Sequence, residues 1–235
     1  MSRILALDTS ADACSVALLC DGVAVELFSE VPREHTRRLL PMVEQILAQH
    51  QLSLSQLDAI AFGRGPGSFT GLRICLGVVQ GLAFGADLPV IPVSTLEAMA
   101  YGVWRQPQSS SPGKILAALD ARMDEVYWAE YDVHDSGITA ATSEYVMSPA
   151  TVVNQLAAGF SGQRIGVGSG WHYPAMASIP VTSLDMQACV HAGDIASLGE
   201  IYWQQGATMT ALEARPVYLR DSVAWKKRER IRPVT

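Results

Sequence analysis

Two stretches decide the fold: Arg3-Ile4-Leu5-Ala6-Leu7-Asp8 and Lys114-Ile115-Leu116-Ala117-Ala118-Leu119-Asp120. Each is a short apolar run of the kind that forms a buried strand, and each ends at an aspartate that begins a polar turn. A second pair follows in the same order, AIAFG at residues 59–63 and RIGVG at residues 164–168. Two matches in the same order predict an internal duplication, although short apolar runs can also resemble one another by chance.

The boundary between the two copies is predicted at residues 106–113, which are rich in serine and proline. We therefore expect one lobe over residues 1–105 and another over 112–215. A helix around residues 185–205 is expected to close the second lobe. Residues 216–235 form a C-terminal segment that could return to the first lobe.

Composition restricts the class of protein. The chain has 235 residues, 49% of them hydrophobic, which is sufficient for a core. A net charge of −6 argues against a dedicated nucleic-acid binder. The basic run at residues 226–232 could still contact RNA phosphates, but it reads more simply as a solvated end.

Cysteine usage and the N-terminus predict a cytoplasmic protein. The four cysteines form no C-x-x-C pair, and residues 1–7 lack the features of a signal peptide. The longest apolar stretches read as too short to span a bilayer, so no membrane association is expected. The cysteines are Cys14, Cys20, Cys75 and Cys189.

A candidate nucleotide cleft lies where the two repeated strands end. Paired strand–Asp–turn units resemble the plan of actin and the sugar kinases, in which the two turns face each other and hold a metal–nucleotide. Phosphate approach favours a glycine two residues after each aspartate, and neither turn has one. The cleft is therefore predicted to be vestigial, and the aspartates can equally be simple turn formers. Its candidate residues are Asp8, Ser10, Asp120 and Arg122.

The glycine-rich loop at residues 63–73 leads into a helix and is not a Walker A loop, because no Gly-Lys-Ser/Thr follows. It could admit a phosphate beside Arg64 and Arg73. The interpretation that we favour is a tight turn capped by Ser68 or Thr70.

The helix after this loop is apolar on two opposite sides, so both sides need cover. Its glycines at positions 77, 81 and 85 each cost about 1 kcal/mol relative to alanine in a helix interior, and such a row lets another backbone approach. The helix expected over residues 33–49 is its natural neighbour. Together the two helices could form a surface for a partner, with purely internal packing as the alternative.

Searches for metal ligands and nucleophiles give no candidate. No two histidines are three to five residues apart, and no Gly-x-Ser-x-Gly motif occurs. The sequence therefore predicts no catalytic residue and no metal site.

Four motifs resemble the TsaB family, formerly called YeaZ, over nearly the whole chain. They are ILALDTS at residues 4–10, GPGSFTGLR at 65–73, LDAR at 119–122 with EVY at 125–127, and PVYLR at 216–220. The second is highly specific. The resemblance implies an α/β protein with a duplicated actin-like (ASKHA, ribonuclease H-like) two-lobed fold.

The resemblance also implies a function. TsaB takes part in making threonylcarbamoyladenosine beside the anticodon of tRNA, as the non-catalytic partner of the transferase TsaD, and the ATPase TsaE joins them. TsaD binds metal through a His pair, which is missing here because Leu39 stands one turn after His35. TsaB pairs through its first two helices, which places the expected contact by position on Leu39, Val43, Ile46, Ile74, Gly77, Val78 and Gly81.

Further expectations follow from the same resemblance. The same apolar surface would allow a homodimer when the partner is absent. ATP or ADP could bind at a subunit junction, and tRNA would be met only through the complex. The alternatives are a glycoprotease of peptidase family M22, for which no residues are evident, and a stand-alone actin-like ATP-binding protein.

Overall fold

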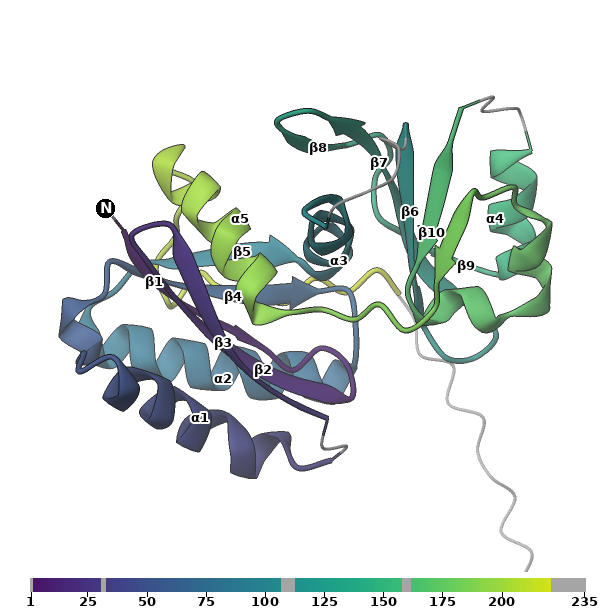
Figure 1. The fold of residues 1–235 in the computed structure, drawn as a ribbon. Coiled ribbons are helices and arrows are strands. Elements are labelled where there is room, and N and C mark those ends of the chain that lie inside the picture. Colours follow the sequence, from purple (N-terminus) through teal and green to yellow (C-terminus); the bar gives the residue numbers. More distant parts are fainter. Residues whose placement is uncertain (1, 31–32, 107–112, 158–161, 221–235) are drawn as a thin grey trace, which may run out of the picture.

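The computed structural model describes residues 2–30, 33–106, 113–157 and 162–220, which form two lobes (Figure 1). The basic run at 226–232 lies outside the described residues. The first lobe contains a five-stranded sheet in the order β3-β2-β1-β4-β5. Strands β1 to β3 are antiparallel, while β4 and β5 run parallel to β1. The strands are β1 (Arg3–Asp8), β2 (Ala13–Cys20), β3 (Val23–Glu30), β4 (Ala59–Gly65) and β5 (Val90–Ser94).

The second lobe repeats this topology. Its main strands follow the order β8-β7-β6-β10-β11, with β6 to β8 antiparallel and β10 and β11 parallel to β6. Strand β9 (Tyr145–Met147) pairs with β7 beside this path. The predicted duplication is therefore confirmed in the order and direction of both sets of strands. The strands are β6 (Lys114–Asp120), β7 (Val126–His134), β8 (Gly137–Ala140), β10 (Arg164–Val167) and β11 (Ser183–Asp185).

Two helices, α1 (His35–Gln49) and α2 (Phe69–Ala86), lie side by side on one face of the first sheet (Figure 1). The apolar face of α1 packs on β2, as its spacing predicts. In α2, Leu72, Cys75, Val79 and Ala83 are buried toward the sheet. These residues recur at helical spacing, so only one side of α2 is fully covered by its own lobe.

The helix α5 (Ala192–Gln204) corrects one prediction. It was expected to close the second lobe, but it covers the other face of the first sheet. Ile195 and Ala196 pack there with Ile4 and Ala6. Contact between these apolar side chains removes both the helix face and the sheet face from water. The helix α3 (Thr95–Trp104), from the first copy, instead packs mainly on the second sheet and lies between the lobes (Figure 1).

The remaining helical segments are short. The helix α4 (Pro149–Leu156) packs on the second lobe, with Ser148 accepting a hydrogen bond from the Thr151 amide as its N-cap. The described residues also contain the short 3₁₀-helices η1 (Leu54–Gln56), η2 (Ser169–His172) and η3 (Pro174–Ser178). The last two contribute Trp171 and Met176 to the core of the second lobe.

The chain after α5 runs along the first lobe. Met209 and Val90 exchange backbone hydrogen bonds of 3.0 and 2.9 Å, and the Gln80 amide donates to the Ala211 carbonyl at 3.1 Å. The Val217 amide then donates to the Arg64 carbonyl on β4 at 2.8 Å. Residues 207–217 therefore belong spatially to the first lobe.

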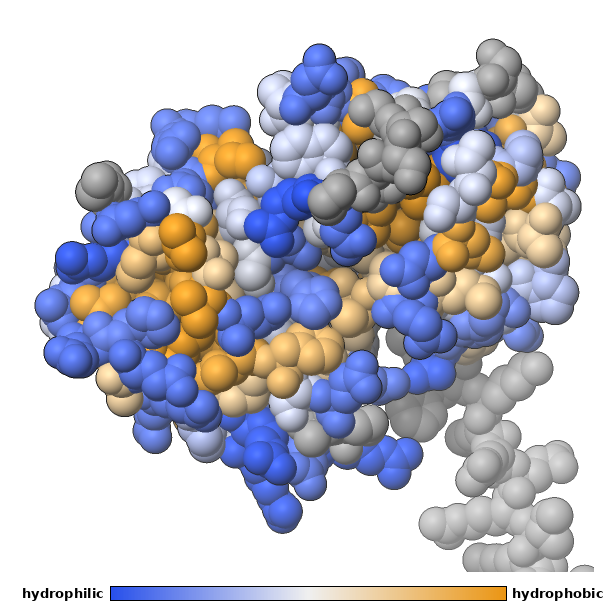
Figure 2. Space-filling view, in the orientation of Figure 1, coloured by the Kyte–Doolittle hydropathy of each residue, from blue (hydrophilic) through white to orange (hydrophobic). Residues whose placement is uncertain are grey.

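Two surface features of the first lobe are apolar. Figure 2 shows apolar surface near the β2–β3 hairpin, where Val23, Val25 and Phe28 of the edge strand are exposed. The other is α2, which by length and composition could cross a membrane, so the expectation that every apolar stretch is too short is wrong. Its packing on the first sheet is that of a core helix.

Candidate functional site

The first aspartate turn is closed on itself. Asp8 ends β1 and is buried, and its Oδ1 accepts hydrogen bonds from the Ser10 amide at 3.0 Å and the Ser10 hydroxyl at 2.8 Å. The amide two residues after the aspartate, where phosphate approach would favour a glycine, is therefore bound to Asp8. This geometry is that of an Asx turn, one of the two interpretations left open by the sequence.

The other carboxyl oxygen of Asp8 has no hydrogen-bond partner among the described residues. It lies against Gly63, where an added Cβ would be 2.0 Å from Oδ2. Burial raises the pKa of Asp8 to about 7, against the opposing effect of the Ser10 hydrogen bonds. This carboxyl therefore changes charge near neutral pH, inside the first lobe.

The glycine-rich loop packs tightly on this turn. A Cβ at Gly67 would lie 2.6 Å from the Ser10 carbonyl oxygen, and one at Gly71 would lie 1.9 Å from that of Thr9. The Ser68 amide donates to the Ser10 carbonyl at 2.7 Å, and the Ser68 hydroxyl accepts from the Gly71 amide as the N-cap of α2. The glycines thus serve close backbone packing and a capped turn, as the favoured interpretation predicts.

Both arginines of the loop have protein partners. Arg64 forms a bidentate ion pair with Glu144 of the second lobe, with both N–O distances 3.0 Å. The Arg73 guanidinium lies 3.6 Å from the centre of the Phe69 ring and donates to the Tyr218 hydroxyl at 3.0 Å. Arg64 therefore ties the lobes together, and these protein partners account for both arginines without a bound phosphate.

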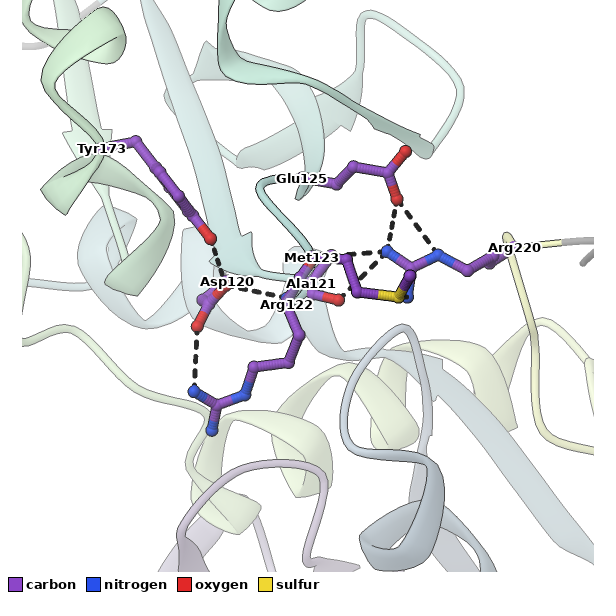
Figure 3. Close-up of polar contacts among 7 residues, drawn as sticks. All are labelled: Asp120, Ala121, Arg122, Met123, Glu125, Tyr173 and Arg220. Atoms are coloured by element: carbon purple, nitrogen blue, oxygen red, sulfur yellow. Dashed lines mark hydrogen bonds and ion pairs between the residues drawn. The ribbon is translucent and has the colours of Figure 1, made fainter. Parts of the chain in front are cut away.

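The second aspartate turn is also closed, as Figure 3 shows. Asp120 Oδ1 accepts from the Arg122 amide at 2.8 Å and from the Tyr173 hydroxyl at 2.9 Å, and Oδ2 accepts from the Arg122 guanidinium at 3.2 Å. As in the first lobe, the residue two positions after the aspartate donates its amide back to the aspartate. The repeat thus extends from the strands to the turn geometry.

The backbone after Asp120 is strained. Arg122, Met123 and Asp124 have φ angles of 59°, 58° and 59°, in the left-handed region that side chains other than glycine seldom adopt. Such residues cost on the order of 1 kcal/mol or more each and persist only where their surroundings hold them.

Arg220 supplies that support from the C-terminal segment (Figure 3). Its guanidinium forms an ion pair with Glu125 and donates to the Ala121 and Arg122 carbonyls at 3.2 and 3.4 Å. Sequence reasoning did not assign a role to Arg220, Glu125 or Tyr173, although Arg220 and Glu125 lie in the quoted PVYLR and EVY motifs.

The variant Arg220→Met tests this support. It keeps the length of the side chain but removes the charge-assisted bonds, so we expect a loss of about 2 kcal/mol in the free energy of unfolding and faster amide exchange at residues 121–125. Arg122→Met is the matched control. Its side chain is 79% exposed and pairs with Asp120 next to it, so the change should stay below about 0.5 kcal/mol. Equal losses from the two variants would contradict the role of Arg220.

The two turns border a cavity of about 500 Å³ between the lobes. Ser10, Asp120 and Arg122 line it, together with Arg220, whereas Asp8 does not line it. The structure therefore brings three of the four predicted cleft residues to one cavity. The fourth, Asp8, is buried and hydrogen-bonded to Ser10. Among the described residues no cluster of three or more potential metal ligands occurs.

The predicted partner surface divides into a covered part and a free part. Leu39, Val43 and Ile46 are no more than 2% exposed and belong to the core of the first lobe. Their side chains cannot contact a partner, which corrects that part of the prediction. The reason is that the apolar stripe of α1 is the one that packs on β2.

The free part lies on α2. Gly77 and Gly81 are exposed, and a Cβ added at either would meet no atom within 4 Å; the same holds for Gly85. Phe84, in the same row, is 71% exposed, and Ile74 and Val78 are half-buried at the edges. The α2 glycine face, defined as Gly77, Gly81, Phe84 and Gly85, is thus an open apolar surface on which the helix backbone itself is accessible.

Two lobes with the same sheet order, each with a first strand ending in an aspartate turn beside a shared cavity, define the actin-like class of the ribonuclease H-like fold. Residues 29–198 match the family model described as "TsaD: tRNA N6-adenosine threonylcarbamoyltransferase". The chain is 46% identical to the tRNA threonylcarbamoyladenosine biosynthesis protein TsaB of Escherichia coli, over 96% of this chain and 97% of that protein. It is 45% identical to that of Haemophilus influenzae, over 95% and 96%.

The solved structure of YeaZ from Pseudomonas aeruginosa superposes with a TM-score of 0.85 at 44% identity, covering 93% of this chain and all of that one. The chain therefore belongs to the TsaB (YeaZ) family of tRNA threonylcarbamoyladenosine biosynthesis proteins.

Proposed function

We propose that this chain is a non-catalytic scaffold subunit of the complex that makes threonylcarbamoyladenosine in tRNA. It binds and supports a catalytic TsaD-like paralogue, and a TsaE-like ATPase joins the pair. Two findings support this role: full-length relatives are named TsaB, and the matching family model is named for the transferase. In a symmetric dimer the same patch of each copy pairs with itself, and a paralogue of the same fold would present a related patch.

The observation that carries the proposal is the α2 glycine face. Three glycines spaced by four residues weaken the helix by about 1 kcal/mol each relative to alanine, and nothing in the described residues occupies the space above them. A helix of a partner could approach the α2 backbone closely there, with Phe84 as an apolar anchor. The binding residues that we propose are thus Ile74, Gly77, Val78 and Gly81 from the sequence prediction, with Phe84 and Gly85 added.

The variant Gly81→Leu tests the pairing. The added side chain fills the space a partner backbone would need, so we expect the dissociation constant for a purified TsaD-like paralogue to rise at least about tenfold. The isolated chain should stay folded, and the midpoint of its thermal unfolding should be unchanged or higher, because leucine favours a helix more than glycine does.

The matched control for Gly81→Leu is Gln155→Leu, which adds the same side chain at an exposed position of α4 in the second lobe. It should leave the affinity for the TsaD-like paralogue unchanged. Unchanged affinity in Gly81→Leu, measured by titration calorimetry, would count against this docking face.

The same face would serve a homodimer when no paralogue is present. Addition of the TsaD-like subunit should then convert dimers to heterodimers in sedimentation experiments. In this proposal ATP or ADP can bind at a subunit junction, tRNA is met through the complex, and the assembly works in the cytoplasm.

The second candidate is an enzyme acting alone, either as a peptidase of family M22 or as an actin-like ATPase. One solved relative is described as having "similarity to peptidase YEAZ". Against an ATPase stands the closure of both aspartate turns by their own amides. Turnover of ATP or peptide by the purified chain, lost on Asp8→Asn, would favour this candidate over the scaffold.

A further inference from the structure

A cavity of about 840 Å³ lies apart from the interlobe cleft, bordered by α3, the start of α5 and β3. Its lining includes Cys189, His191 and Glu26. The sulfur of Cys189 lies 3.5 Å from Nε2 of His191, and Nδ1 of that ring lies 2.9 Å from Glu26 Oε2. The three side chains thus form a thiol–imidazole–carboxylate row on the wall of an open cavity.

The local chain geometry explains the row. Cys189 and His191 are two residues apart in the non-helical segment before α5, and in extended chain such residues point to the same side. Glu26 comes from β3 of the first lobe, where its second oxygen accepts from the Gly193 amide at 3.2 Å. The carboxylate is therefore fixed by α5 while it holds the imidazole.

The imidazole is held in one orientation. Its ring stacks on Phe28, with the ring centres 4.6 Å apart, while Glu26 holds one nitrogen and Cys189 meets the other. The hydrogen bonds to Cys189 and to Glu26 raise the pKa of His191 to about 10, although burial opposes them. The ring is thus a cation at neutral pH, and both its N–H groups donate, one to the carboxylate and one to the sulfur.

We propose that Cys189 is a reactive cysteine that undergoes thiol–disulfide exchange with small disulfides entering this cavity. The ring nitrogen of His191 that faces the sulfur can stabilise the negative charge that a cysteine carries when it attacks as a nucleophile. In the exchange, the Cys189 thiolate attacks one sulfur of the disulfide and a new S–S bond forms. The original S–S bond breaks, and the other half leaves as a thiolate that takes a proton from water.

Thiol–disulfide exchange is the reaction class that this row supports best. Acyl transfer by the same three groups would also need donors placed for an oxyanion. Exchange requires only a thiolate, a partner cation and access. The cavity provides access, and the cation beside the sulfur is His191, because the other cation of the wall, Arg105, is paired with Asp194 at 2.7 Å.

The other cysteines serve as internal controls. Cys14 and Cys75 are fully buried and report unfolding if they react. Cys20 is half-buried like Cys189, but among the described residues its thiol has no hydrogen bond to a histidine, and burial raises the pKa of that thiol. The part of the difference between Cys189 and Cys20 that His191→Gln removes therefore measures the effect of the row.

The test uses the purified full chain and oxidised glutathione at pH 7, with the modified cysteines identified by peptide mass mapping over time. We expect Cys189 to form the mixed disulfide on the order of ten times faster than Cys20. His191→Gln should remove most of this difference, and Glu26→Gln should reduce it, while the rate at Cys20 stays unchanged. Cys14 and Cys75 should stay unmodified in all variants.

Equal rates at Cys189 and Cys20 in the unaltered chain would overturn the proposal. So would a Cys189 rate that His191→Gln leaves unchanged while Cys14 and Cys75 remain protected. If a variant exposes those two buried thiols, Phe28→Leu is used in its place. It removes the stacking partner of the His191 ring and should also slow the formation of the mixed disulfide at Cys189. The outcome does not depend on the scaffold function, because no partner protein enters the experiment.

Discussion

Replacing Gly71 by alanine should lower the free energy of unfolding by at least about 3 kcal/mol. The added Cβ would lie 1.9 Å from the Thr9 carbonyl oxygen and 3.0 Å from its carbon. Both atoms are backbone, so no side chain can rotate away, and either α2 or the Asp8 turn must move. That movement would also disturb the Thr9 hydroxyl, which donates to the Gly71 carbonyl at 2.8 Å.

The control for this change is Gly85→Ala in the same helix. A Cβ there meets no atom within 4 Å, so the variant should be unchanged or more stable by up to about 1 kcal/mol. For a chain of this size, each kcal/mol lost from the free energy of unfolding lowers the midpoint of thermal unfolding by about 2–4 °C. The midpoint of Gly71→Ala should therefore fall by roughly 6–12 °C, and that of Gly85→Ala should not fall. Equal midpoints would refute the close-packing role of the loop glycine.

The duplication was predictable because its signals are local. A strand that is buried on both faces reads as an apolar run, and an aspartate at its end reads as a turn, wherever the strand lies in the fold. The position of α5 was not predictable in this way. Its apolar side suits either sheet, and only packing between residues far apart in sequence, such as Ile195 on Ile4, assigns it to the first.

The partner surface shows the same limit. Helical spacing identifies Leu39 and Val43 as apolar but does not say which neighbour covers them, and β2 does. The glycines of α2 carry more information, because a glycine inside a helix has a local cost that calls for a reason in packing or binding. Gly77 and Gly81 are accordingly the predicted residues that the structure leaves open.

The support of the second turn depends on contacts that sequence spacing cannot show. Arg220 meets Glu125 across 95 positions of the chain, and Tyr173 meets Asp120 across 53. Nothing in the local pattern around residues 121–125 predicts three left-handed residues without glycine. The one available signal was an arginine placed after an apolar C-terminal segment, within the PVYLR motif.

The stability of the chain should fall as the pH rises from about 4 to 7, and Asp8 should account for a large part of that fall. Its pKa is raised from an ordinary value of 3.8 to about 7 by burial. In this window the folded chain holds the proton while the unfolded chain releases it, so each step upward in pH favours unfolding. Above pH 7 the folded chain also releases the proton, and the loss in the free energy of unfolding reaches its full value. For a pKa shift of this size that loss is about 4 kcal/mol.

Asp8→Asn removes the ionisation and keeps an oxygen for the Ser10 amide and hydroxyl. Relative to the unaltered chain, the variant should therefore gain about 2–3 kcal/mol between pH 5 and pH 8 in denaturant unfolding. Asp12→Asn, at an exposed position of the same turn, should show a much smaller change over that range, confined to its charge effect on His35, whose pKa burial lowers and the Asp12 carboxylate raises. A difference for Asp8→Asn that does not grow with pH would mean that water or a cation reaches Oδ2 in solution. Burial alone would then no longer account for the environment of the Asp8 carboxyl.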